Sequence, residues 1–302
     1  MADESQNKKN KISRVITGII ISLIALGSIF LGGLPILAFL LVVICLGSME
    51  YVKILHTKGF HPSLSLILLT NFVFALLIFF RRFDLMPSIL SLAIMASFLI
   101  VLFMGRQPYI ANVATTVLGY LYAGWLPCHL MLIRQFGSDR INAFQVGVNE
   151  GLWLVLLVFL VVVATDIGGY YFGTKFGKTK LAPVVSPKKT VEGAIGATCF
   201  AVIVASFGVF YTNLSFLQCI IAGFLITVFA QLGDLSESLV KRDAGVKDSS
   251  NILPGHGGIM YRADGYLFAV PVAYYYFVNF THGNNILLEF FKYIQGIINV
   301  YF

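Results

Sequence analysis

Charged residues are scarce in this chain: Asp, Glu, Lys and Arg together make up 12% of its 302 residues. Hydrophobic residues make up 58%, and the mean hydropathy is +0.86. So few charges exclude an ordinary soluble domain, which carries about twice that share. The apolar runs approach the roughly 20 residues with which a helix crosses a bilayer, and they lack the alternation of barrel strands. The composition therefore predicts an all-α, polytopic transmembrane helix bundle.

Cysteine is equally scarce, with four in the chain: Cys45, Cys128, Cys199 and Cys219. Each stands alone within an apolar run, without the paired spacing of a metal or redox site. Such cysteines are typical of small apolar packing residues. The sequence also lacks evident internal repeats and low-complexity linkers, so it predicts one integral membrane domain.

The apolar runs predict about nine spans, at residues 15–31, 35–49, 63–80, 85–104, 110–133, 151–164, 191–211, 215–233 and 265–280. Sixteen Lys and Arg residues then lie on the side of the N-terminus and five on the other side. Positive residues favour the cytoplasm, so we expect residues 1–14 to form a basic cytoplasmic tail. The net charge of +7 suits anionic lipids and substrates, whereas short basic loops disfavour nucleic acid as a partner.

Polar residues gather in one window, residues 231–264. A helix predicted over 230–242 has one polar face, formed by Asp234, Glu237, Ser238 and Lys241. Its opposite face is apolar, formed by Leu232, Leu235 and Leu239. A solvated helix face with ion pairs one turn apart would carry the same residues. The helix continues out of a predicted span, however, where ionisable groups favour a functional interpretation.

A glycine-rich loop follows this helix, with the sequence PGHGG at 254–258. Successive backbone N–H groups in such a loop can bind phosphate oxygens, although a tight turn at the membrane surface would look the same. Basic residues flank the loop: Lys241, Arg242, Lys247 and Arg262. Acidic residues flank it too: Asp234, Asp248 and Asp264. Together they indicate a site for phosphate and Mg²⁺, which prefers carboxylate and phosphate oxygens.

The string SESLVKRDAGVKDSSNILPGHGG, over residues 236–258, resembles the signature of the phosphatidate cytidylyltransferases, also called CDP-diacylglycerol synthases. The family pattern continues as Gly-Gly-hydrophobic-x-Asp-Arg-x-Asp, whereas this chain reads GGIMYRAD over 257–264. Tyr261 therefore stands where the family has an aspartate that is expected to bind metal. A phenol is neutral at physiological pH and replaces an anionic ligand poorly.

A second polar stretch, DIGGYYFGTKFGKTKLAPVVSPKKTVE, covers residues 166–192. Its glycines and aromatic residues predict a broken or interfacial helix after Asp166, with small-residue packing against a neighbouring helix. Thr190 is a good helix N-cap, and the following helix offers an anion site beside Lys188 and Lys189. A cytoplasmic anchor with a helix cap is the alternative interpretation. The stretch also resembles the same family, in its GKTKL and SPKKTVEG segments.

The resemblance implies an enzyme that transfers CMP from CTP to phosphatidic acid and releases pyrophosphate. Residues 166–302 would form the catalytic region and residues 15–165 a scaffold. The resemblance also implies a homodimer among membrane lipids, in a bacterial inner membrane. The count of basic residues places the site on the cytoplasmic side. Two other classes stay open, a secondary transporter and a catalytically impaired relative that binds lipid or acts as a scaffold.

The residues of the site follow from chemistry and from the resemblance together. Mg²⁺, with a second cation as an open alternative, is assigned to Asp234, Asp248 and Asp264. Phosphates are assigned to Lys188, Lys189, Lys241, Arg242, Lys247 and Arg262, with backbone donors from Gly255, Gly257 and Gly258. Orienting roles are assigned to Ser186, Thr190, Ser238 and His256.

Overall fold

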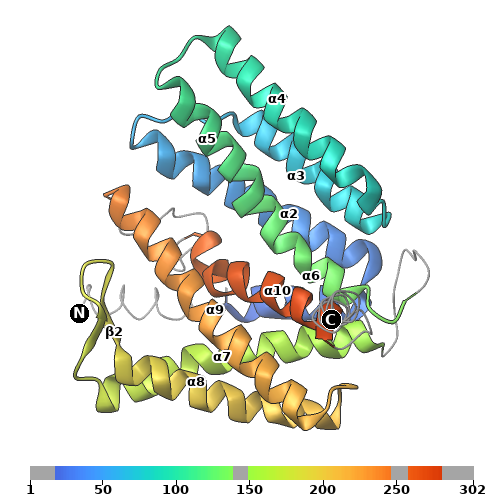
Figure 1. Cartoon of the computed structure of the whole chain (residues 1–302), viewed down its shortest axis with the longest axis vertical. Coiled ribbons are helices and arrows are strands. Elements are labelled where there is room, and N and C mark those ends of the chain that lie inside the picture. Colours follow the sequence, from blue (N-terminus) through green and yellow to red (C-terminus); the bar gives the residue numbers. More distant parts are fainter. Residues whose placement is uncertain (1–17, 139–148, 246–257, 281–302) are drawn as a thin grey trace, which may run out of the picture.

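The computed structural model describes residues 18–138, 149–245 and 258–280 (Figure 1). Within them the first helix is Gly18–Leu31. The other α-helices are α2 (Gly33–His56), α3 (Leu64–Phe79), α4 (Met86–Met104), α5 (Tyr109–Tyr120), α6 (Leu126–Arg134), α7 (Glu150–Phe176), α8 (Val191–Ser206), α9 (Phe216–Asp243) and α10 (Met260–Phe280). Short helices are η1 (Phe83–Leu85), the π-helix η2 (Leu121–Trp125) and η3 (Phe207–Phe210). The strands are β1 (Lys180–Ala182) and β2 (Ser186–Thr190).

Six of these helical segments are long and apolar enough to cross a membrane, so the chain is an integral membrane protein. They are Gly33–His56, Phe83–Met104, Tyr109–Arg134, Glu150–Phe176, Val191–Phe210 and Phe216–Asp243. Two shorter apolar helices, Gly18–Leu31 and Leu64–Phe79, coincide with predicted spans. The all-helical class is confirmed, and the count of nine spans stays a prediction.

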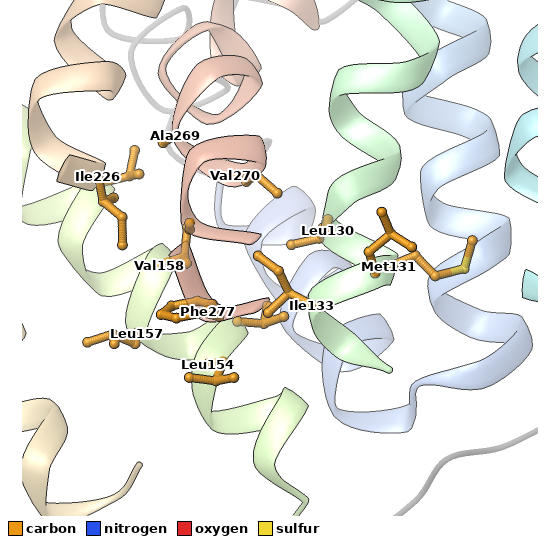
Figure 2. Packing of buried hydrophobic residues seen from close by; sticks show 14 of the residues in the cluster. Leu130, Met131, Ile133, Leu154, Leu157, Val158, Ile226, Ala269, Val270 and Phe277 are labelled. Carbon is orange, nitrogen blue, oxygen red and sulfur yellow. The ribbon is translucent and has the colours of Figure 1, made fainter. Parts of the chain in front are cut away.

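The bundle has two sides joined by central helices. In Figure 1, α3, α4 and α5 lie at the top, α7 and α8 lie at the bottom, and α10 lies between them. The α7–α8 pair and the α9–α10 pair pack extensively. Figure 2 shows the side chains that join the two sides, among them Ile133 of α6, Leu157 of α7, Ile226 of α9 and Phe277 of α10. These four side chains are fully buried.

The predicted break after Asp166 is wrong, because α7 continues without interruption from Glu150 to Phe176. Its glycines are sites of close packing. A Cβ atom on Gly168 would lie 3.0 Å from Ala197 Cα on α8. The tight contact between the two helices stabilises a glycine-containing segment that would be weak as an isolated helix. The small-residue packing predicted for this stretch is therefore confirmed.

A β-hairpin, which the sequence did not predict, follows α7. Strands β1 and β2 are antiparallel, and Lys180 faces Thr190. The Glu192 carboxylate accepts hydrogen bonds from the backbone N–H groups of Lys178 and Thr179, at 3.0 and 3.1 Å. Thr190 ends β2, and its Oγ1 accepts a hydrogen bond from Gly193 N at 3.2 Å. The predicted N-cap is thus confirmed, and it fixes the hairpin at the start of α8.

Candidate active site

A cavity of about 320 Å³ lies between α7, α8, α9 and the hairpin. Its polar lining comes from Thr165, Asp166, Thr174, Lys188, Lys189, Thr190, Gln231 and Asp234. The two polar stretches of the sequence therefore meet in one place. Figure 1 shows β2 beside the ends of α7 and α8, at the left edge of the bundle. The cavity combines ammonium groups from β2 with carboxylates from α7 and α9.

An ion pair joins the two polar stretches. Lys189 Nζ lies 2.5 Å from Asp234 Oδ2, and both side chains are partly buried. The nitrogen itself is shielded from solvent. The pair therefore links β2 to α9 at the cavity.

Asp264 of α10 lies close to the same carboxylates. A Cβ atom on Gly233 would lie 2.5 Å from Asp264 O, so the backbones of α9 and α10 nearly touch there. The charge of Asp264 interacts with the charges of Asp234, Glu237 and Asp166. Carboxylates from three helices thus converge beside the cavity.

These carboxylates suit Mg²⁺, although they do not complete a site by themselves. Within residues 18–138, 149–245 and 258–280, no three His, Cys, Asp or Glu side chains are close enough to hold one metal ion. Asp248, the third predicted ligand, lies outside the described residues. Mg²⁺ commonly binds one or two carboxylates together with substrate phosphates and water. Asp234 and Asp264 fit that pattern.

The end of α9 buries its polar face. Lys241 Nζ lies 2.5 Å from Glu237 Oε2, and both side chains are almost fully buried. Leu232 and Leu239, on the apolar face, are 44% and 55% exposed. The interpretation as a solvated polar face is therefore wrong. Polar groups face the protein, and leucines face outward, as expected at a membrane surface.

Other predicted residues lie around the cavity or beyond the described part of the chain. Arg242 donates a hydrogen bond from Nε to Val185 O, at 3.3 Å, and so links α9 to the hairpin turn. Ser186 begins β2, and Ser238 is partly buried on α9. Gly258 is buried before α10, and Tyr261 and Arg262 lie in the first turn of that helix. Lys247, Asp248, Gly255, His256 and Gly257 lie outside the described residues.

Glu50 of α2 belongs to this region, although no motif of the sequence indicated it. Its side chain is fully buried, and Oε1 accepts a hydrogen bond from Ile259 N at 2.7 Å. Its charge also interacts with that of Glu237. The signal was present in the sequence, because Glu50 is an acid beside a long apolar run. It was missed because the predicted span ended at residue 49.

Comparison with known proteins finds relatives along most of this chain. The sequence profile of the cytidylyltransferase family matches residues 12–280. A phosphatidate cytidylyltransferase of Synechocystis sp. is 33% identical over 289 residues, 88% of this chain and 96% of the relative. One of Staphylococcus haemolyticus is 34% identical over 276 residues, 86% of this chain and 96% of the relative. One of Staphylococcus aureus is 46% identical over 126 residues, which make up 41% of this chain and 48% of the relative. This chain therefore belongs to the cytidylyltransferase family, as the resemblance of its motifs predicted.

Proposed function

We propose that this protein is a phosphatidate cytidylyltransferase. An oxygen of the phosphatidic acid phosphate attacks the α-phosphorus of CTP. The bond from the α-phosphorus to the bridging oxygen of the β-phosphate breaks, and pyrophosphate leaves with the electron pair. The observation that carries the proposal is the Lys189–Asp234 pair in a cavity shared by both motif regions. Similarity along nearly the whole chain favours an active enzyme over an impaired lipid-binding relative.

The basic residues of the cavity bind the triphosphate in this proposal. Lys188 and Lys189 both line the cavity, on the strand that leads into α8. The phosphates of CTP compete with Asp234 for the Lys189 ammonium. Binding of CTP thereby releases the Asp234 carboxylate, and it places the α-phosphorus among fixed positive charges. Catalysis of this kind depends on positioning and charge neutralisation.

Asp234 and Asp264, together with Asp248, would hold Mg²⁺, and a second cation is compatible with the number of acids. When bound, Mg²⁺ neutralises negative charge on the phosphates of both substrates. The acids Asp166 and Glu237 stay close enough to add to the negative field at the site. That negative field favours the binding of a divalent cation.

The surroundings of the cavity suit a lipid acceptor. Ile167, Tyr170 and Ile195 flank it on α7 and α8, and each is more than half exposed. Apolar side chains exposed on a membrane helix face acyl chains. Phosphatidic acid can therefore keep its tails in the bilayer while its phosphate enters the cavity. We also propose that the site faces the cytoplasm, where CTP is, and that two copies of the chain form a homodimer.

The test is pyrophosphate release from CTP by the purified full chain, in micelles that contain phosphatidic acid. We expect release with Mg²⁺ and none after removal of the metal with EDTA. Tyr261→Asp is measured in parallel, since it restores the aspartate of the family pattern. Release by the unchanged protein means that Tyr261 is compatible with catalysis. Pyrophosphate release by Tyr261→Asp alone identifies an impaired enzyme. The absence of release by both proteins contradicts the proposal. Light scattering in detergent tests the homodimer.

A further inference from the structure

A second cavity, of about 250 Å³, lies in the other half of the molecule, between the ends of α2 and α4 and the start of α3. Its lining includes His56, His61 and Arg106, here called the polar wall, and Ile100, Val101 and Met104 of α4, here called the apolar wall. The first set is polar or cationic, and the second set is apolar. The cavity is therefore amphipathic, like a lipid headgroup together with the first carbons of its acyl chains.

One buried amide builds the polar wall. Asn112 of α5 is 1% exposed. Its Oδ1 accepts a hydrogen bond from His61 N at 2.7 Å, and its Nδ2 donates one to Arg106 O at 3.0 Å. The loop between α2 and α3 and the loop between α4 and α5 are thus fixed to each other. The imidazole rings of His56 and His61 lie side by side, with centroids 5.3 Å apart.

The charge of this wall suits an anion. Arg106 carries a permanent positive charge, and an imidazole donates at least one hydrogen bond in either charge state. The part of the cavity lining that the structure describes contains no carboxylate. Arg106 also has no ion pair with the described acids of residues 18–138, 149–245 and 258–280. A phosphate group would supply the missing negative charge.

The position of the cavity favours a lipid as the source of that phosphate. Lys58 and Asp243 form an ion pair at 3.5 Å, which places the end of α2 beside the end of α9. The cavity therefore lies at the same end of the bundle as the candidate active site, where headgroups are found if these helices cross the bilayer. Phe103, next to its apolar wall on α4, is 84% exposed. Basic pockets between membrane helices bind anionic headgroups in other proteins.

We propose that this cavity binds the phosphate headgroup of an acidic phospholipid, with an acyl chain along α4. It shares no lining residue with the cavity of Lys189 and Asp234, within the part of the chain that the structure describes. The bound lipid is therefore not the acceptor of the transferred CMP. Such a site would make the α2–α5 half of the protein bind acidic phospholipids of the surrounding membrane.

The test counts lipid adducts on the purified full chain by native mass spectrometry. Phosphatidylglycerol is compared with phosphatidylcholine, and glycerol 3-phosphate is added as a competitor without acyl chains. We expect the unchanged protein to bind phosphatidylglycerol preferentially and Arg106→Gln to bind it at least tenfold more weakly. Arg106→Lys should retain most of the binding. Lys53→Gln is the matched control, because Lys53 is an exposed cation one turn before His56 that does not line the cavity.

Equal binding of phosphatidylglycerol by Arg106→Gln and the unchanged protein would overturn the proposal. So would binding of phosphatidylcholine as tight as that of phosphatidylglycerol. Effective competition by glycerol 3-phosphate would show that the site takes a free phosphate group, which overturns the assignment to a lipid. Thermal unfolding of each variant checks folding, and this assay needs neither CTP nor turnover. Its outcome is therefore independent of the proposed enzymatic activity.

Discussion

Among the described residues, two Lys–Asp pairs involve α9, and their surroundings differ. The Lys189–Asp234 pair is partly buried in the cavity at 2.5 Å. The Lys58–Asp243 pair is longer, at 3.5 Å, and 75% of the Asp243 side chain is exposed. Exposed ion pairs contribute little to stability, because water and salt screen them. The two aspartates thus offer a matched comparison on a single helix.

We expect Asp234→Asn to lower kcat about 100-fold or more, since it removes a carboxylate from the substrate site. Asp243→Asn, the control, should stay within about twofold of the unchanged protein, as expected for a surface pair. Pyrophosphate release at saturating CTP measures both. A similar loss in the two variants would mean that Asp234 acts only through general stability.

Glu50 gives a prediction about the N-terminal half of the chain. Glu50→Ala leaves the partly buried N–H of Ile259 without its acceptor, which costs about 1–3 kcal/mol of unfolding free energy. Glu50→Gln keeps an oxygen in the same place and should recover at least half of that loss. Thermal unfolding of the purified protein separates the two variants. Equal melting temperatures for Glu50→Ala and the unchanged protein would show that this hydrogen bond does not hold the start of α10.

At the level of elements, the crossing of α7 and α8 shapes the active-site cavity. A Cβ atom on Gly193 would lie 2.9 Å from Gly173 Cα and 3.1 Å from Gly169 O. Both are backbone atoms of α7, and they cannot move away from a new Cβ atom as a flexible side chain can. Gly193→Ala must therefore separate the two helices.

We expect Gly193→Ala to lower the unfolding free energy by about 1–3 kcal/mol, the usual cost of overpacking. Gly169→Ala is the matched control, because its Cβ atom would meet only Ala197 Cβ, at an ordinary contact distance of 3.8 Å. Thermal unfolding in detergent measures both variants. A larger loss for Gly169→Ala than for Gly193→Ala would contradict this account of the helix crossing.

The sequence predicted elements well where the signal was local. Long apolar runs predicted the membrane helices, and Thr190 predicted the start of α8. The helix over 230–242 was correctly read as the end of a longer one, α9. The meeting of the two polar stretches was also predicted, from the resemblance and from shared chemistry. The cavity lined by Lys188, Lys189 and Asp234 agrees with that expectation.

The sequence predicted elements poorly where the cause was a distant partner. Glycines at 168–177 look like a turn, and only contact with α8 explains why α7 passes through them as a helix. The hairpin is too short for a strand pattern, and Glu192 stabilises it from the following helix. Glu50 accepts a hydrogen bond from the backbone N–H of Ile259, which is 209 residues away in the chain. No local pattern contains that information.

The whole molecule separates its charges between two ends. Arg242 contacts the hairpin turn, and Lys58 contacts Asp243, so the ends of α2 and α9 and the hairpin lie together. At the opposite end, Arg134 is fully buried and donates a hydrogen bond from Nε to Ile29 O, at 2.7 Å. One of the five positive residues assigned to that side thus has a structural role.

This separation predicts the orientation of the protein in the membrane. Lys180 on β1 and Arg82 between α3 and α4 are both exposed, at opposite ends of the bundle. In intact cells, a maleimide that cannot cross membranes should label Arg82→Cys but not Lys180→Cys, because positive loops stay in the cytoplasm. Permeabilised cells should show labelling of both, and the unchanged protein corrects for its four native cysteines. Labelling of Lys180→Cys in intact cells would place the candidate active site away from cytoplasmic CTP, and it would contradict both the orientation and the proposed reaction.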